Sequence, residues 1–217
     1  NFVLIAEAMN SIERRSRGQV KLWDDEDGFY YDVLRVSGNP DRYFSVELRS
    51  LVGILALFPV AAIDFGQFDD AGIRGLKEQT RWFRDNHPDF LDQVLTPHAG
   101  ERERHLLSFV KPDRLKIILK RVFDETEFLG PHGIRGISQV YRDTPASLTV
   151  DGVTISARYE PAESSVGLFG GNSNWRGPVW FPINFLLVDA LRRYHEFLGA
   201  DFRVEYPARS GQQRDLG

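Results

Sequence analysis

The last third of the chain carries the clearest alternation of apolar and polar positions. From Phe181 to Leu198, apolar residues recur every three or four positions and charged residues stand between them. This period is that of an amphipathic α-helix with one face against a core. The same period predicts helices over residues 1–15 and 71–86, and a short helix that begins at Pro112 with Leu115, Ile118, Leu119 and Val122 facing inward.

Other stretches follow different patterns. Residues 46–64 are apolar on nearly every side, which predicts a buried helix. The most apolar run within it, residues 51–63, has 13 residues and is too short for the roughly 20 of a membrane span. Residues 147–159 alternate around Asp151-Gly152, a strong signal for a β-hairpin. Short strands are expected on both sides of an acidic turn at residues 24–27, and residues 89–110 are expected to form a loop with a short helical turn.

Composition narrows the class of protein only slightly. The chain has 217 residues, a formal net charge of −4, and 42% hydrophobic residues, which suits one globular core. The absence of a basic stripe argues against nucleic acid as a partner. Cysteine is absent, so disulfides and thiolate metal sites are excluded, and a cytoplasmic location is expected. The chain opens within an apolar helical pattern, which suggests part of a longer protein.

The stretch from Gly170 to Asn184 concentrates residues that suit a ligand. It reads GGNSNWRGPVWFPIN and feeds directly into the last predicted helix. A pyranose ring offers an apolar C–H face to indole rings and hydroxyl groups to guanidinium and amide groups. The alternative from the residues alone is a packed loop in which Trp175 and Trp180 belong to the core and Arg176 caps a helix.

This stretch also resembles a known family. The run Asn174-Trp175-Arg176-Gly177-Pro178-Val179-Trp180, with Asn184 after it, is similar to the tryptophan–arginine–glycine–proline signature of glycoside hydrolase family 63. That family includes the processing α-glucosidases and their bacterial relatives. Residues 22–32 and 132–138 resemble two further stretches of the family and stand in the same order. The resemblance spans roughly residues 1–206.

The resemblance implies a fold and an activity. Family 63 catalytic domains are (α/α)6 toroids of six inner and six outer helices, so a mainly α chain is expected. Its length supplies about half of such a barrel, as one partial domain over residues 1–206 with one or two β-hairpins and a polar tail at 207–217. The family hydrolyses α-glycosidic bonds with inversion and needs no cofactor. Its acid Asp precedes the first matching stretch and its base Glu follows the last, so this chain alone is expected to be inactive.

The resemblance and the residue chemistry together select candidate substrate-binding residues. These are Trp23, Asp27, Glu160, Asn174, Trp175, Arg176 and Trp180. Two other interpretations of the acidic turn are a solvated charge cluster and a calcium site. Arg49 and Arg135 also allow two interpretations, a structural ion pair or a contact to substrate, because a buried guanidinium needs a partner. The five histidines show no metal-ligand spacing, and no metal is expected.

Two functions follow as hypotheses. The first is a fragment of an α-glucosidase-like enzyme whose partners are a saccharide and the remainder of the catalytic domain, with no nucleic acid and no membrane. The isolated fragment is expected to self-associate, because half a barrel exposes apolar surface. The alternative is a carbohydrate-binding or scaffold segment that lacks both catalytic carboxylates.

Overall fold

The computed structural model of the protein describes residues 2–10, 22–39, 42–64, 74–88, 95–98, 101–161, 164–165, 167 and 179–217. The helices in these ranges are α1 (Phe2–Asn10), α2 (Leu51–Ile54), α3 (Arg74–Asn86), α5 (Pro112–Val122) and α6 (Phe181–Leu198), with the 3-10 turns η1 (Leu55–Leu57) and η3 (Gln139–Tyr141). The strands are β1 (Trp23–Asp24), β2 (Phe29–Tyr30), β3 (Asp32–Arg35), β4 (Tyr43–Val46), β5 (Val60–Asp64), β6 (Leu95–His98), β7 (Glu101–Ser108), β8 (Leu129–Gly130), β9 (Gly133–Ile134), β10 (Ala146–Val150), β11 (Val153–Ala157), β12 (Val204–Glu205) and β13 (Gln213–Arg214).

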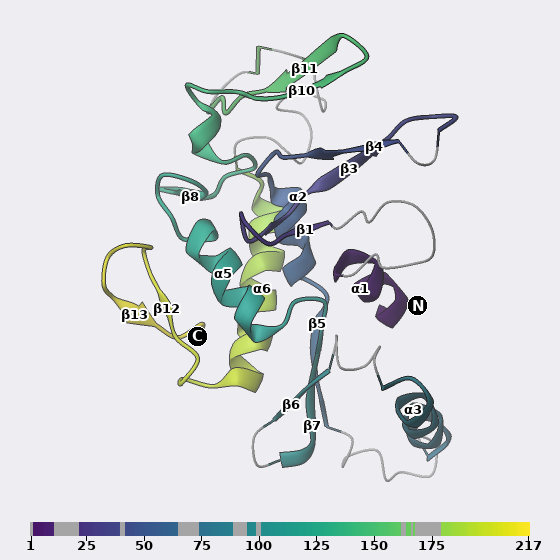
Figure 1. The fold of residues 1–217 in the computed structure, drawn as a ribbon. Coiled ribbons are helices and arrows are strands. Elements are labelled where there is room, and N and C mark those ends of the chain that lie inside the picture. Colours follow the sequence, from purple (N-terminus) through teal and green to yellow (C-terminus); the bar gives the residue numbers. More distant parts are fainter. Residues whose placement is uncertain are drawn as a thin grey trace.

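The strands form small antiparallel sheets around the helices. The largest sheet has the order β5-β7-β6, and the described strands otherwise pair two by two. Figure 1 shows α6 running through the middle of the molecule, with the hairpins β3–β4 and β10–β11 above it and the three-stranded sheet below. Because α6 also packs against β5 and β7, it joins the sheet to the rest of the core.

A single apolar cluster holds these elements together. It draws side chains from α2, α5, α6 and the strands β2, β5 and β7, and hydrophobic burial of this kind is the main favourable term in folding. The largest fully buried side chains are Tyr194, Phe29, Phe128, Leu51, Ile54, Leu57, Leu106, Leu115, Ile118, Leu119 and Val110. In the described ranges, no helix has the length and apolar character to cross a membrane.

The predicted helical toroid is wrong for this chain, whose described residues form a mixed α/β fold. Two stretches account for most of the difference. The expected helix over residues 46–64 is only the short α2–η1 segment, because Pro59 cannot continue a helix and the following residues pair with β7 as β5. In residues 89–110, the expected loop contains the paired strands β6 and β7.

The elements with strong local signals agree with their predictions. Helix α6 has the predicted bounds, α3 lies within the predicted range, and α5 begins at Pro112 as predicted, with Leu115, Ile118, Leu119 and Val122 buried. The hairpin β10–β11 turns at Asp151 and Gly152, with φ angles of 51° and 80°. Two consecutive positive φ values define the type I′ turn that Asp-Gly favours. At the C-terminus, the predicted polar tail contains β13, which pairs with β12.

Candidate functional site

The acidic turn has a defined structure between β1 and β2. The Asp24 carboxylate accepts hydrogen bonds from the backbone N–H groups of Glu26 and Asp27, at 3.0 and 2.7 Å. The turn closes at Gly28, which has a φ of +62° and donates its N–H to the Asp24 carbonyl. A glycine fits this left-handed conformation without strain. The turn thereby holds the Asp27 side chain in one place.

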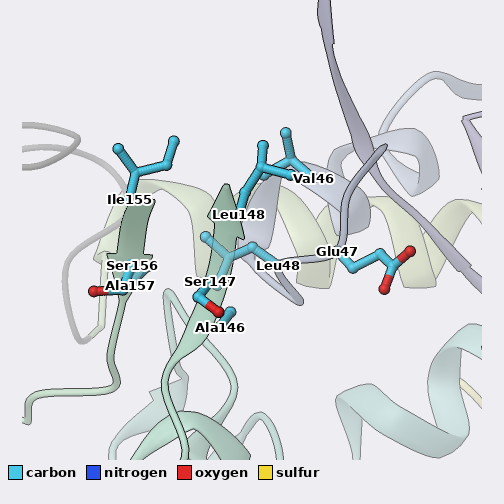
Figure 2. A pocket seen from close by; sticks show the side chains of 9 residues that line it. All are labelled: Val46, Glu47, Leu48, Ala146, Ser147, Leu148, Ile155, Ser156 and Ala157. Atoms are coloured by element: carbon cyan, nitrogen blue, oxygen red, sulfur yellow. The ribbon is translucent and has the colours of Figure 1, made fainter. Parts of the chain in front are cut away.

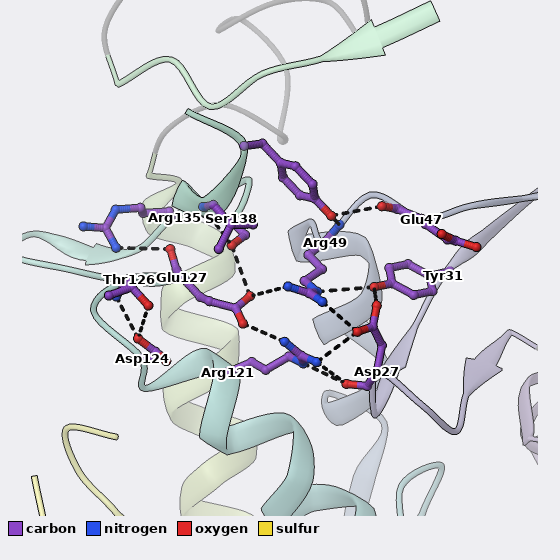
Figure 3. Close-up of polar contacts among 12 residues, drawn as sticks. Asp27, Tyr31, Glu47, Arg49, Arg121, Asp124, Thr126, Glu127, Arg135 and Ser138 are labelled. Carbon is purple, nitrogen blue, oxygen red and sulfur yellow. Dashed lines mark hydrogen bonds and ion pairs between the residues drawn. The ribbon is translucent and has the colours of Figure 1, made fainter. Parts of the chain in front are cut away.

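Asp27 belongs to a network of two guanidinium groups and two carboxylates (Figure 3). Arg49 donates to the Asp27 carboxylate at 2.7 Å, and Arg121 donates to the Asp27 carbonyl through Nε at 2.8 Å. Arg121 also donates to the Glu127 carboxylate at 2.6 Å, while Arg49 lies 3.6 Å from it. Two positive charges therefore balance two negative charges in a partly buried site, as low-dielectric surroundings require. We define Asp27, Arg49, Arg121 and Glu127 as the ion-pair network.

The network lowers the pKa of Asp27. Burial raises the pKa of the Asp27 carboxyl, but hydrogen bonds from Tyr31 and Arg49 and the charges of Arg49 and Arg121 outweigh it, so the pKa lies below its ordinary value. Burial raises the pKa of the Tyr31 hydroxyl, which donates to Asp27. Asp27 is therefore ionised at neutral pH and acts as an acceptor, not as a general acid.

Glu127 connects the network to residues 132–138. Its carboxylate accepts a hydrogen bond from the Ser138 hydroxyl at 3.1 Å, and its carbonyl accepts one from the Gln139 N–H at 3.0 Å. Ser138 also donates its N–H to the Arg49 carbonyl at 2.9 Å. Residues 22–32 and residues 132–138 are therefore held together through Arg49 and Glu127.

Asn184 connects residues 132–138 to the start of α6. Its side-chain oxygen accepts the Ile134 N–H at 2.7 Å, and its amide group donates to the carbonyls of Ile134 at 3.1 Å and Trp180 at 2.9 Å. A backbone bridge between Arg135 and Val179 lies beside these bonds. Three stretches that are far apart in sequence, at residues 22–32, 132–138 and 179–184, thus form one connected polar assembly.

The predicted substrate-binding residues have different placements. Trp23 is buried, with its ring under the Arg114 guanidinium at 4.6 Å and its Nε1 donating to Asp25, so it packs in the core. Glu160 lies on the surface, where its carboxylate accepts the Ser165 N–H at 2.7 Å. Hydrogen bonds from the side chain of Ser165 and from its backbone N–H lower the pKa of Glu160. Trp180 is half-buried at the N-terminus of α6, and its carbonyl accepts the Asn184 N–H.

Three of the predicted residues, Asn174, Trp175 and Arg176, lie outside the described residues. The structure therefore brings Asp27 and Trp180 into the connected assembly, with Asp27 in the ion-pair network and Trp180 at its α6 end. Substrate binding by the seven residues remains a prediction.

Arg49, which is half-buried, and Arg135, which is buried, both have protein partners. Arg49 pairs with Asp27, as the ion-pair reading predicted. Arg135 donates to the carbonyls of Leu129 at 2.6 Å and Glu127 at 3.2 Å. Sequence reasoning missed Arg121 and Glu127. Arg121 lies among the charged positions of a predicted helix, and the only signal for Glu127 is a carboxylate between the apolar helix of residues 112–122 and a glycine-rich loop.

An apolar hollow lies elsewhere, between the end of β4 and the hairpin β10–β11 (Figure 2). It is lined by Val46, Glu47, Leu48, Ala146, Ser147, Leu148, Ile155, Ser156 and Ala157. Figure 2 shows the Glu47 carboxylate extending away from the hairpin. The hollow therefore lacks the convergent polar groups of a saccharide site. Within the described ranges, no group of three His, Asp or Glu residues is suited to hold a metal ion.

Comparison with known proteins finds a relative that matches this chain over a small part of its own length. The chain has a mixed α/β fold in which a polar assembly links three separate stretches of sequence. No family model and no solved structure matches the chain. The uncharacterised protein YMR196W of Saccharomyces cerevisiae is 42% identical over 200 residues. The match covers 90% of this chain and 18% of the yeast protein, so the chain spans less than a fifth of that relative's length.

Proposed function

We propose that this chain is a segment of a longer α-glycosidase of the family 63 type, which hydrolyses α-glucosidic or closely related bonds with inversion. The observation that supports the proposal is the convergence of the three stretches that resemble the family. Arg121 links Asp27 to Glu127, and Glu127 in turn accepts a hydrogen bond from Ser138. Asn184 accepts a hydrogen bond from the Ile134 N–H at 2.7 Å. Three sequence matches scattered by chance have no reason to meet in space. The proposal concerns activity and does not include a helical barrel.

The substrate contacts are assigned to Trp180, at the N-terminus of α6, and to three residues that precede it in the sequence. Trp175 and Trp180 would stack on the C–H face of a pyranose, while Arg176 and Asn174 would bind its hydroxyl groups. Asp27 already accepts hydrogen bonds from Arg49 and Tyr31, so its main role in this proposal is to position the assembly. Trp23 contributes to the core beneath it.

Hydrolysis itself would use carboxyl groups outside this chain. An inverting glycosidase needs an acid and a base roughly 6.5–9.5 Å apart, with a water molecule between the base and the sugar. The resemblance assigns these roles to an Asp before residue 22 and a Glu after the last matching stretch. The activity therefore belongs to the longer protein, for which a cytoplasmic location is also proposed, since the chain has no cysteine that an oxidising compartment would pair.

A pair of tryptophan variants tests the proposal in the longer protein. Trp175→Ala should lower kcat/KM on an α-glucoside roughly tenfold or more, because a stacked ring supplies binding energy of about 1.4 kcal/mol or more. The matched control is Trp82→Ala, because Trp82 is exposed on α3 outside the connected assembly. The control should leave kcat/KM unchanged.

Three results would count against the proposal. Equal losses in the two variants would remove the assignment of Trp175. A longer protein that binds α-glucosides without cleaving them would favour the carbohydrate-binding alternative. A longer protein that neither binds nor cleaves them would end both hypotheses.

A further inference from the structure

Helix α6 is apolar on two opposite sides. One side packs into the core through Leu187, Ala190, Tyr194 and Phe197, which are buried. The other side carries Phe181, Phe185 and Val188, at positions i, i+4 and i+7. With 100° of rotation per residue, these two sets point in nearly opposite directions. We call Phe181, Phe185 and Val188 the outer stripe of α6.

The outer stripe is open to solvent. The exposed fractions are 80% for Phe181, 62% for Phe185 and 49% for Val188, and Val179 just before the helix is also exposed. The stripe ends one turn further on at Arg192, which is exposed and charged. Two turns of apolar side chains are thus followed by a charged turn. A soluble surface rarely presents two neighbouring phenylalanine rings in this way unless another surface covers them.

We infer that the outer stripe is an interface for an apolar surface of the longer protein, outside the present residues. A helix that is apolar on both sides is typically enclosed between two packed layers. This chain supplies one layer, through β5 and β7. The yeast relative contains a matching stretch that makes up only 18% of its length, so in that protein ample chain remains to supply the second layer.

The chemistry of the stripe favours this occupant over others. Phe181, Phe185 and Val188 offer no hydrogen-bonding side-chain group, whereas a saccharide or a nucleotide needs several. Along α6, the stripe is followed by the Asp189–Arg193 ion pair at 2.9 Å and by the exposed Arg192, which suit a polar rim around an apolar contact. The expected occupant is therefore the aliphatic or aromatic face of a helix or sheet. This inference is independent of the proposed glycosidase activity, but it rests on the proposal that the chain is a segment of a longer protein.

Thiol labelling tests the inference, because the natural chain contains no cysteine. The test variant is Phe185→Cys, with Phe181→Cys as a second position on the stripe. The control is Val153→Cys in the β10–β11 hairpin, where Val153 is also exposed. Each variant is labelled with a maleimide, both in the 217-residue chain and in the longer protein. Both stripe variants should label at rates near the control in the chain, and at least tenfold more slowly than the control in the longer protein.

Each other outcome would overturn the inference. Stripe thiols that label as fast as the Val153→Cys thiol in the longer protein would show an uncovered stripe. Slow labelling in the 217-residue chain at all concentrations would show that the chain covers the stripe itself. Protection that increases with concentration, together with a dimeric mass in sedimentation, would assign the stripe to a second copy. A native protein with the mass of the 217 residues alone would leave no occupant of the proposed kind.

Discussion

Replacing Glu127 with Gln is the sharpest perturbation of the ion-pair network. The side chain is 9% exposed, and its carboxylate serves Arg121 at 2.6 Å, Ser138 at 3.1 Å and Arg49 at 3.6 Å. The substitution keeps the shape and removes the charge. The two guanidinium groups are then left with one carboxylate, that of Asp27, in a site where both are largely shielded from solvent.

The expected magnitude follows from the burial of the partners. Removing one partner of a fully buried ion pair costs about 3–5 kcal/mol. Here the side chains of Arg49 and Arg121 are 20% and 21% exposed, and Asp27 still pairs with both. We therefore expect the free energy of unfolding to fall by about 2–3 kcal/mol. With a urea m-value near 3 kcal/mol/M, the unfolding midpoint would fall by about 0.8 M.

Urea unfolding monitored by fluorescence and by circular dichroism measures this change. The matched control is Asp151→Asn, which neutralises the surface pair between Asp151 and Arg42. Asn tolerates the positive φ of that turn position, and exposed ion pairs contribute little, so the midpoint should not move. Equal midpoints for wild type and Glu127→Gln, or equal shifts in both variants, would refute the reasoning.

Four further substitutions, the last of them a control, test other parts of the account. Asp27→Asn should make the free energy of unfolding less dependent on pH in the acid range. The pKa of the Asp27 carboxyl in the folded protein lies below the ordinary 3.8. The ionised carboxylate therefore stabilises the fold above pH 3.8, and this stabilisation is lost as the pH falls through the folded-state pKa. Urea midpoints at pH 5 and pH 3 should differ less in this variant than in wild type, and an unchanged difference would contradict the assignment. Asn184→Leu should lower the free energy of unfolding by about 2 kcal/mol, because it leaves the N–H and C=O of Ile134 without partners; a thermal shift of less than 1 °C would be inconsistent with this. Gly53→Ala should destabilise by about 2 kcal/mol or more, since a Cβ there would lie 2.4 Å from a backbone carbonyl, whereas Gly75→Ala in α3 meets open space and should stabilise slightly. The same sign for both glycine variants in urea unfolding would show that the packing around Gly53 is misjudged.

Local signals explain which parts of the fold could be predicted. The hairpin at Asp151-Gly152 and the helix of residues 181–198 each depend on residues close together in sequence. The sheet β5-β7-β6 does not, because Val60 pairs with Ser108 and no local sequence signal around either residue indicates this pairing. An apolar run with no clear period fits a buried strand as well as a buried helix. The helix predicted for residues 46–64 is therefore right only for α2 and η1, whereas Val60–Asp64 form the strand β5.

The candidate site divides in the same way. The prediction that Arg49 pairs with an acid of the turn needed only the rule that a buried guanidinium has a partner. Arg121 and Glu127 were missed because Arg121 reaches Asp27 across 94 positions in sequence, and it occupies a helix position that reads as solvated. The hydrogen bonds between Asn184 and Ile134 could not be predicted either, although both residues belong to stretches that resemble family 63.

The configuration of the first-formed sugar tests the central claim most directly. The longer protein would be incubated with an α-glucoside, and proton NMR spectra would be recorded before mutarotation equilibrates the product. The account predicts that β-glucose appears first, because an inverting enzyme delivers water to the face opposite the leaving group. Release of α-glucose first, or no hydrolysis of any α-glucoside, would contradict it.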